Sequence, residues 1–149
     1  DTKIIDEDGL LLRIRDHLEK HDESVLVIEG HYADLVPNEF IIAAVLLRTD
    51  PFVLEKRLMQ RNYSESKIKE NIQAEILNDC GSYLREKGLS VPIFEYDTAQ
   101  IGVEQIAADI YELIRGNDTN VKIVIQKHEK NMNIDWFSIS DERLDRFFI

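Results

Sequence analysis

The sequence is poor in the residues and runs that mark several classes of protein. It holds a single cysteine, Cys80, which excludes an internal disulfide. Its longest apolar run, Phe40–Leu47, is far shorter than the roughly 20 residues that a membrane-spanning helix needs. The charged opening Asp1–Gly9 has no apolar signal segment. We therefore expect no membrane partner and a reducing compartment, the cytoplasm, or also the nucleus if the source is eukaryotic.

The motifs of several common catalytic sites are also missing. The chain has no HExxH, no Cys/His cluster and no Gly-x-Ser-x-Gly, which excludes hydrolytic zinc sites and nucleophile elbows. None of its six glycines belongs to a G-x-x-x-x-G-K-[ST] loop, the element that cradles the phosphates of a nucleotide. The chain as given therefore lacks the part that would grip β- and γ-phosphates.

Positive charge is scarce. Lysine and arginine number 18 against 29 aspartates and glutamates, so the net charge is −11. Such a surface repels phosphate backbones and disfavours direct binding of nucleic acid. It is compatible with a basic protein partner, although acidity that merely aids solubility is the simpler explanation of the charge alone.

What is present is an alternation of helical and strand-like patterns. Continuous apolar runs predict strands that are covered on both faces, as in a parallel sheet, and helices separate these runs. We therefore predict a three-layer α/β fold with right-handed crossovers. The expected strands are 24–30, 40–49 and 91–98, and the expected helices cover 6–20, about ten residues from Pro51, 67–87 and 103–114.

Residues 1–116 carry this alternation and form the predicted α/β domain. Residues 117–149 differ and are predicted to form a C-terminal extension, either a strand at 121–126 plus a short helix or a docking tail.

Three arginines surround one predicted strand-to-helix turn in this acidic chain. Arg48 follows the end of a strand, at the edge where open α/β sheets bind ligands. Arg57 and Arg61 are four residues apart, so they lie on one side of the helix that starts at Pro51 and flank its apolar stripe. Such arginines either extend their charge to water or meet an anion at the sheet edge.

Other polar residues fall at similar places. Asn71 and Glu75 flank the apolar stripe of the next helix in the same way. Glu29 closes a predicted strand, where a carboxylate could hold Mg²⁺ through water or orient a nucleophile. Gly30 permits a sharp exit from that strand and presents His31 at its mouth, although a histidine there more often has a structural role.

These residues resemble a known family. The runs "VLVIEGHYADLVP" and "LLRTDPFVLEKRLMQRNYSESKIKENIQAEI" are similar to the adenylate kinase isoenzyme 6 family of small P-loop kinases. The resemblance covers about residues 3–115 and is most specific in "RTD-x₆-RL-x₂-R-x-Y" and in "NIQAEI". The latter argues against another P-loop kinase, such as a shikimate-type enzyme. The resemblance implies a nucleoside monophosphate kinase-like parallel sheet without its N-terminal strand and phosphate loop, which lie before the point that matches Asp1.

The resemblance also assigns roles. Glu29 matches the acidic residue of the Walker B strand, usually Asp, and would hold Mg²⁺ through water, while His31 matches a histidine linked to catalysis. Arg57 and Arg61 match a pair of which the first lies against the ATP adenine and the second reaches the phosphates from the lid. Asn62–Ser66 would be a short lid, with Asn62 where a glycine of positive φ is usual. The matched segment also includes Arg48, Asn71 and Glu75, which we assign to nucleotide binding.

The implied activity is that of an adenylate kinase, ATP + AMP ⇌ 2 ADP, with ATPase activity and Mg²⁺ bound to ATP. The family is also linked to small ribosomal subunit maturation and rRNA processing. The alternative is a non-catalytic assembly factor that binds a basic ribosomal protein. Because the phosphate loop is missing, we expect the chain as given to be truncated and inactive alone.

Overall fold

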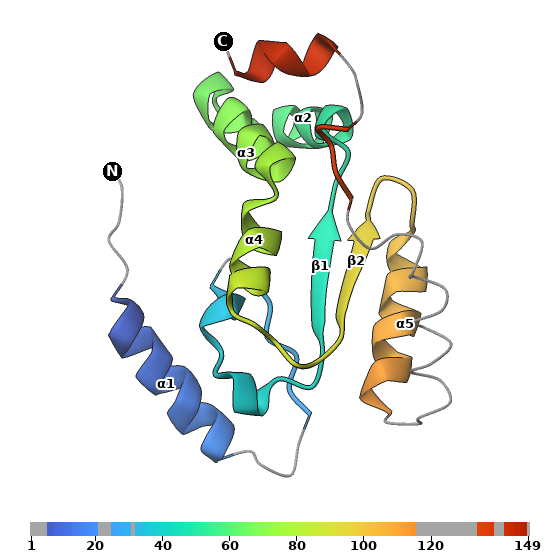
Figure 1. Cartoon of the computed structure of the whole chain (residues 1–149). Helices are drawn as coiled ribbons and strands as arrows, with labels where there is room; N and C mark the ends of the chain where they lie inside the picture. The colour runs from blue at the N-terminus through green and yellow to red at the C-terminus, as the bar shows by residue number, and fades with distance from the viewer. Residues whose placement is uncertain (1–5, 21–24, 31, 116–133, 139–141, 149) are drawn as a thin grey trace.

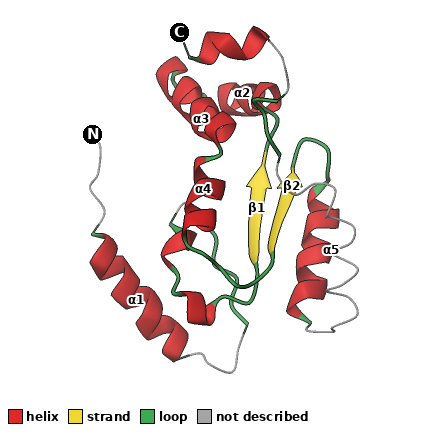
Figure 2. Cartoon of the chain, in the orientation of Figure 1, coloured by secondary structure: helices red, strands yellow, loops and turns green. Residues whose placement is uncertain are grey.

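The computed structural model describes residues 6–20, 25–30, 32–115, 134–138 and 142–148. Helices predominate over a small sheet (Figures 1 and 2). No helix in these ranges is long and apolar enough to cross a membrane. The elements, in chain order, are α1 (Glu7–Glu19), η1 (Ala33–Leu35), η2 (Asn38–Phe40), β1 (Ala44–Arg48), α2 (Pro51–Gln60), α3 (Glu65–Leu77), α4 (Asp79–Glu86), β2 (Ile93–Asp97), α5 (Val103–Ile114) and η3 (Glu142–Phe147).

The sheet confirms two of the three predicted strands and their parallel direction. β1 and β2 pair in parallel with Ala44 opposite Ile93 and Arg48 opposite Asp97. Because side chains alternate between the faces of a strand, one face carries the apolar core that packs against α5, with Phe94 at its centre. In Figure 1, α4 lies beside β1 and α5 lies beside β2, with the two strands between the helices.

One polar contact fixes α5 beside this core. The phenol of Tyr96, on β2, donates to Asp109 Oδ2 over 3.4 Å, and Gln105 Nε2 donates to Asp109 Oδ1 over 2.8 Å. Burial first, and then the neighbouring Asp109 carboxylate, raise the pKa of Tyr96 well above its ordinary value. The phenol therefore stays protonated and able to donate throughout the physiological range.

The strand predicted at 24–30 is wrong for the part that the structure describes. Residues 25–30 form no regular element, and Val25 and Val27 are 51% and 70% exposed. A continuous apolar run becomes a buried strand only where a neighbour supplies its backbone hydrogen bonds. Among the described residues, the sheet consists of β1 and β2 alone, and neither pairs with this segment.

The helix predicted at 67–87 is divided into α3 and α4. Asn78, between them, has φ 56° and ψ 44°, a left-handed conformation that ends one helix and turns the next. The rotation puts α4 out of phase with the apolar stripe of α3. As a result Ile72 and Ile76 of α3 are buried, whereas Cys80 and Tyr83 of α4 are exposed.

The turn between α2 and α3 agrees closely with the sequence. Asp50 caps α2 by accepting from the backbone of Phe52 and Val53, and Pro51 occupies the first turn. Asn62 has the predicted positive φ, 58°. Two residues later Ser64 caps α3. The chain thus reverses within a few residues, and α2 and α3 pack against each other.

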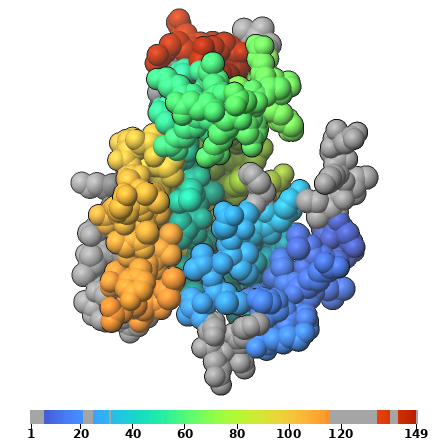
Figure 3. Space-filling view, turned by 180° about the vertical axis from the view of Figure 1, so that it is seen from behind, coloured from blue at the N-terminus to red at the C-terminus, as the bar shows by residue number. Residues whose placement is uncertain are grey.

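The described C-terminal residues dock on this helix pair. Trp136, Leu144 and Phe147 join Ile72 and Ile76 of α3 in one buried cluster. Seen from behind, the C-terminal residues cover the end of the molecule above α2 and α3 (Figure 3). The predicted strand at 121–126 lies outside the described residues.

Candidate functional site

The carboxyl ends of β1 and β2 meet at one edge of the sheet, the usual ligand edge of an open α/β fold. Each strand is followed at once by a threonine, Thr49 or Thr98, and the two hydroxyl oxygens are 2.7 Å apart. The backbone N–H of Thr98 donates to Arg48 O over 2.8 Å, which extends the ladder past the strand end. Two hydroxyl groups are therefore fixed side by side at this edge.

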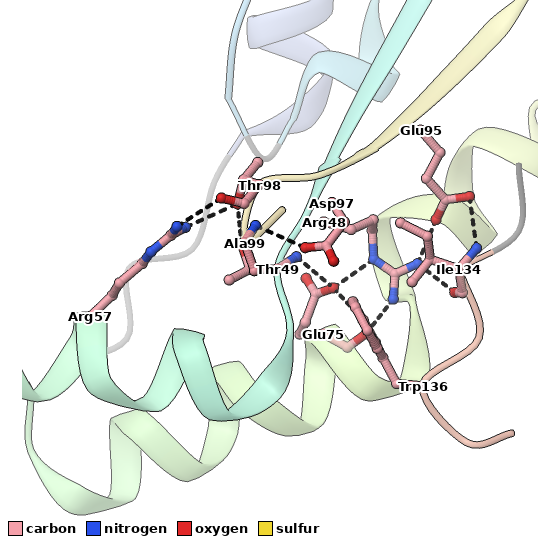
Figure 4. A network of polar contacts seen from close by, with 10 residues as sticks. All are labelled: Arg48, Thr49, Arg57, Glu75, Glu95, Asp97, Thr98, Ala99, Ile134 and Trp136. Carbon is pink, nitrogen blue, oxygen red and sulfur yellow. Dashed lines mark hydrogen bonds and ion pairs between the residues drawn. The ribbon is translucent and has the colours of Figure 1, made fainter. Parts of the chain in front are cut away.

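Arg57 reaches the same edge from α2. Its Nη1 donates to Thr98 Oγ1 over 2.9 Å and its Nη2 donates to Thr98 O over 2.8 Å (Figure 4). A guanidinium has five N–H donors and a planar face that stacks on rings. The described residues form no ion pair between Arg57 and a carboxylate. Its position is thus fixed while its charge is available to an anionic ligand.

Arg48 lies deeper and has its own anions. It is 2% exposed, with Nε 2.6 Å from Glu75 Oε1 and Nη1 2.7 Å from Glu95 Oε1. Its Nη2 donates to the backbone oxygen of Glu75 over 2.7 Å, and Nη1 donates also to Ile134 O over 3.1 Å. The guanidinium of Arg48 is therefore enclosed by protein acceptors (Figure 4).

The sheet register explains this cluster. Glu95 pairs with Leu46, two residues before Arg48, so Arg48 and Glu95 lie on the same face of the sheet. α3 brings Glu75 over that face. One cation then balances two nearby carboxylates, which is favourable only while all three are held in good geometry.

The other predicted site residues are spread more widely. Arg61 is exposed at the C-terminal end of α2. The Asn71 side chain donates to the backbone oxygen of Lys67 in its own helix over 2.7 Å. Glu29 is exposed on the irregular segment 25–30, and the described residues form no ion pair between it and the arginines. His31 lies outside the described residues.

Arg48 and Glu75 are thus brought together, and Arg57 is linked to them only through the threonines. Sequence reasoning missed Thr49, Thr98, Glu95 and Trp136. The signal for the threonines was present, since both follow predicted strands directly and therefore fall at the same edge. The roles of Glu95 and Trp136 depend on register and on a contact between distant segments, which local patterns do not encode.

The donor set is compatible with Mg²⁺ carried by a nucleotide. The described residues contain no group of three or more His, Cys, Asp or Glu side chains that could enclose a metal ion. Mg²⁺ does not require such a cage, because it keeps several waters and binds through substrate phosphates and one or two carboxylates. The exposed carboxylate of Glu29 is a suitable outer ligand of this kind.

Comparisons with known proteins agree with these features. A family model described as an AAA domain matches residues 1–78. A protein of Archaeoglobus fulgidus named "Putative adenylate kinase" is 31% identical over 144 residues, which are 97% of this chain and 75% of that protein. A protein of the same name from Methanocaldococcus jannaschii is 33% identical over 136 residues, 91% of this chain and 66% of the relative.

A eukaryotic relative points in the same direction. A Caenorhabditis elegans protein named "Adenylate kinase isoenzyme 6 homolog" is 42% identical over 83 residues, which are 56% of this chain and 45% of that protein. The matched part is therefore less than half of that relative's length. The resemblance stated above is confirmed: the chain belongs to the P-loop family of adenylate kinases that includes the isoenzyme 6 homologues.

Proposed function

We propose that this chain forms the ATP-binding side of an adenylate kinase that catalyses ATP + AMP ⇌ 2 ADP and slowly hydrolyses ATP. The observation that carries the proposal is the guanidinium of Arg57, held at the ligand edge of the sheet by the hydroxyl and carbonyl groups of Thr98. The names of the relatives support the reaction class.

The arginines would act by positioning and by balancing charge. Phosphoryl transfer spreads negative charge over the transferred group, and fixed cations stabilise it without needing to reorganise. Arg57 would contact the bound ATP. Arg61, exposed beside the turn at Asn62, would reach the phosphates as the short lid closes. No covalent intermediate is required.

The remaining site residues complete the proposal. Bound Mg²⁺ would supply further charge neutralisation, with Glu29 holding its water shell. His31 would orient a lid contact or the attacking water. Arg48 and Glu75 would contribute to nucleotide binding indirectly, because their ion pair holds α3 at the sheet edge beside Thr49. Asn71 remains a predicted nucleotide contact.

Binding of ATP to the 149-residue chain, measured by titration calorimetry, tests the proposal. Replacing Arg57 by alanine is expected to weaken ATP binding about tenfold or more, since hydrogen bonds to charged groups contribute roughly 1.5–3 kcal/mol. Lys56→Ala, an exposed neighbour on the same helix, is the matched control and should bind ATP as the wild type does. Absence of ATP binding at millimolar concentration, or equal affinity in the Arg57 variant, would refute the proposal.

The acidic surface favours a second function alongside the first. The net charge is −11, and α1 presents Glu7, Asp8, Asp16 and Glu19 from a helix without a fully buried residue. A surface of this charge suits a basic small-subunit ribosomal protein. We propose that the chain takes part in small-subunit maturation and rRNA processing through such a protein and not through direct RNA contact, in the cytoplasm or the nucleus.

Salt distinguishes the second function from the first. Binding of purified small-subunit ribosomal proteins, measured by interferometry, should weaken steeply between low and high ionic strength, because exposed charges are screened over about 10 Å at 0.1 M salt. Neutralising Asp8, Asp16 and Glu19 to their amides should weaken binding at low salt and leave ATP binding unchanged. A complex indifferent to both salt and these changes would exclude a charge-driven partner.

A further inference from the structure

A continuous line of hydrogen bonds joins the C-terminal segment to Arg57 at the ligand edge (Figure 4). Trp136 Nε1 donates to Glu75 Oε1 over 2.8 Å, and the backbone N–H of Thr49 donates to the same oxygen over 3.3 Å. The Thr49 hydroxyl is 2.7 Å from that of Thr98, which accepts from Arg57. Residues far apart in sequence thus share one network.

The C-terminal segment is held in this network by several contacts. Trp136 is 4% exposed, and the guanidinium carbon of Arg48 lies 5.8 Å from the centre of its ring. The neighbouring Ile134 accepts from Arg48 and donates its N–H to Glu95 Oε2 over 3.3 Å. Two contacts from the C-terminal segment therefore fix both carboxylates that surround Arg48. The C-terminal segment thus holds Glu75 together with Arg48 and Thr49.

The next residue, Phe137, forms none of the hydrogen bonds that the described residues contribute to this network. Phe137 is 58% exposed and its ring stacks on that of Phe148, with centroids 5.9 Å apart. The segment thus offers one aromatic side chain inside the network and an adjacent one outside it. Comparing variants at Trp136 and Phe137 therefore distinguishes a specific role of Trp136 from a general effect of the C-terminal segment.

We propose that Trp136 is a positioning residue for the nucleotide site, acting on Arg57 through Glu75, Thr49 and Thr98. The inference rests on the function proposed above. Docking of residues 134–136 and binding of ATP then favour each other, because each fixes a network that the other needs. Contiguous contacts alone do not establish such coupling, which must be measured as a change in affinity.

The coupling can be read in both directions with the whole chain. Trp136 is the only tryptophan, so its emission reports the environment of the docked segment. Saturating ATP is expected to change this emission. Reciprocally, Trp136→Phe should raise the Kd for ATP about fivefold, at the lower end of typical couplings between sites, whereas Phe137→Ala should leave it unchanged.

A second variant guards against misfolding of the first. Thr49→Val keeps the size of the side chain and breaks the hydroxyl bridge while leaving Trp136 and the Arg57–Thr98 carbonyl contact in place. We expect its tryptophan emission without ligand to match the wild type and its response to ATP to be lost, with the response restored in Thr49→Ser. A purely structural role of the tail would not produce this pattern.

The outcomes separate the inference from the proposed function. Calorimetry that detects no ATP binding refutes both. ATP binding that depends on Arg57 but neither changes Trp136 emission nor weakens in Trp136→Phe refutes the positioning role and leaves the proposed function standing. An unchanged ATP response in Thr49→Val also overturns the proposed route.

Discussion

Replacing Arg48 by methionine is expected to lower the free energy of unfolding by about 3–5 kcal/mol, the usual cost of breaking a buried ion pair from one side. Methionine fills much of the volume of the arginine stem but offers no donor. Glu75 and Glu95 would then lose the guanidinium that bridges them on the covered face of the sheet. Since small domains have roughly 5–15 kcal/mol of stability in all, the variant should be close to unfolding at moderate temperature.

Urea denaturation followed by circular dichroism measures this loss. Arg13→Met, at an exposed position of α1, changes the same residue type without burial and should shift the free energy of unfolding by less than about 0.5 kcal/mol. Adding Glu75→Gln and Glu95→Gln to Arg48→Met should recover part of the loss, because neutral amides remove the repulsion. A loss below about 1 kcal/mol in Arg48→Met, or no recovery, would show that the carboxylates do not depend on Arg48.

Local patterns in the sequence correctly predicted much of the fold. Apolar runs located β1 and β2, Asp50 and Pro51 located the start of α2, and the pattern at Asn62 located the turn. Two predictions failed because the apolar period does not record what decides the structure. The run at 25–28 has no neighbouring strand among the described residues, and the break at Asn78 depends on one backbone conformation. Neither feature changes the apolar period that predicted a strand and a long helix.

The candidate site divides in the same way. Arg48, Arg57 and Glu75 were selected because they follow a strand or flank an apolar stripe, and the structure places all three around the ligand edge. The partners of these residues were not foreseen. Arg48 meets Glu95 because of strand register and meets Ile134 because of tail docking. Contacts of this kind form only when distant segments come together in the fold, so local spacing in the sequence does not predict them.

The absence of a phosphate loop from the 149 residues is expected to prevent turnover. The 149-residue chain is expected to bind ATP without steadily forming ADP from ATP and AMP, because it has no G-x-x-x-x-G-K-[ST] loop. Arg57 and Arg61 can balance charge, but backbone N–H groups of that loop and its lysine are what align the β- and γ-phosphates for transfer. A coupled assay of ADP formation measures this directly.

A fusion that places a strand and such a loop before Asp1 is expected to form ADP. The ligand edge of the sheet would gain the lysine and the backbone N–H donors of that loop. The exposed apolar residues at 25–28 would gain a strand to pack against. In this fusion Arg57→Ala should lower the rate about 100-fold or more, the effect of losing one preorganised donor to a developing charge. Lys56→Ala should keep full activity.

Each failure of this experiment has a separate meaning. Steady ADP formation by the 149-residue chain alone would show that its own residues align the phosphates and that the loop is dispensable. A folded fusion that binds ATP but stays inactive would favour the binding function served by the acidic surface. Activity that survives Arg57→Ala would assign the charge balance to Arg61, which directly follows α2 at the start of the lid. The contacts of Arg57 with Thr98 would then have a structural role.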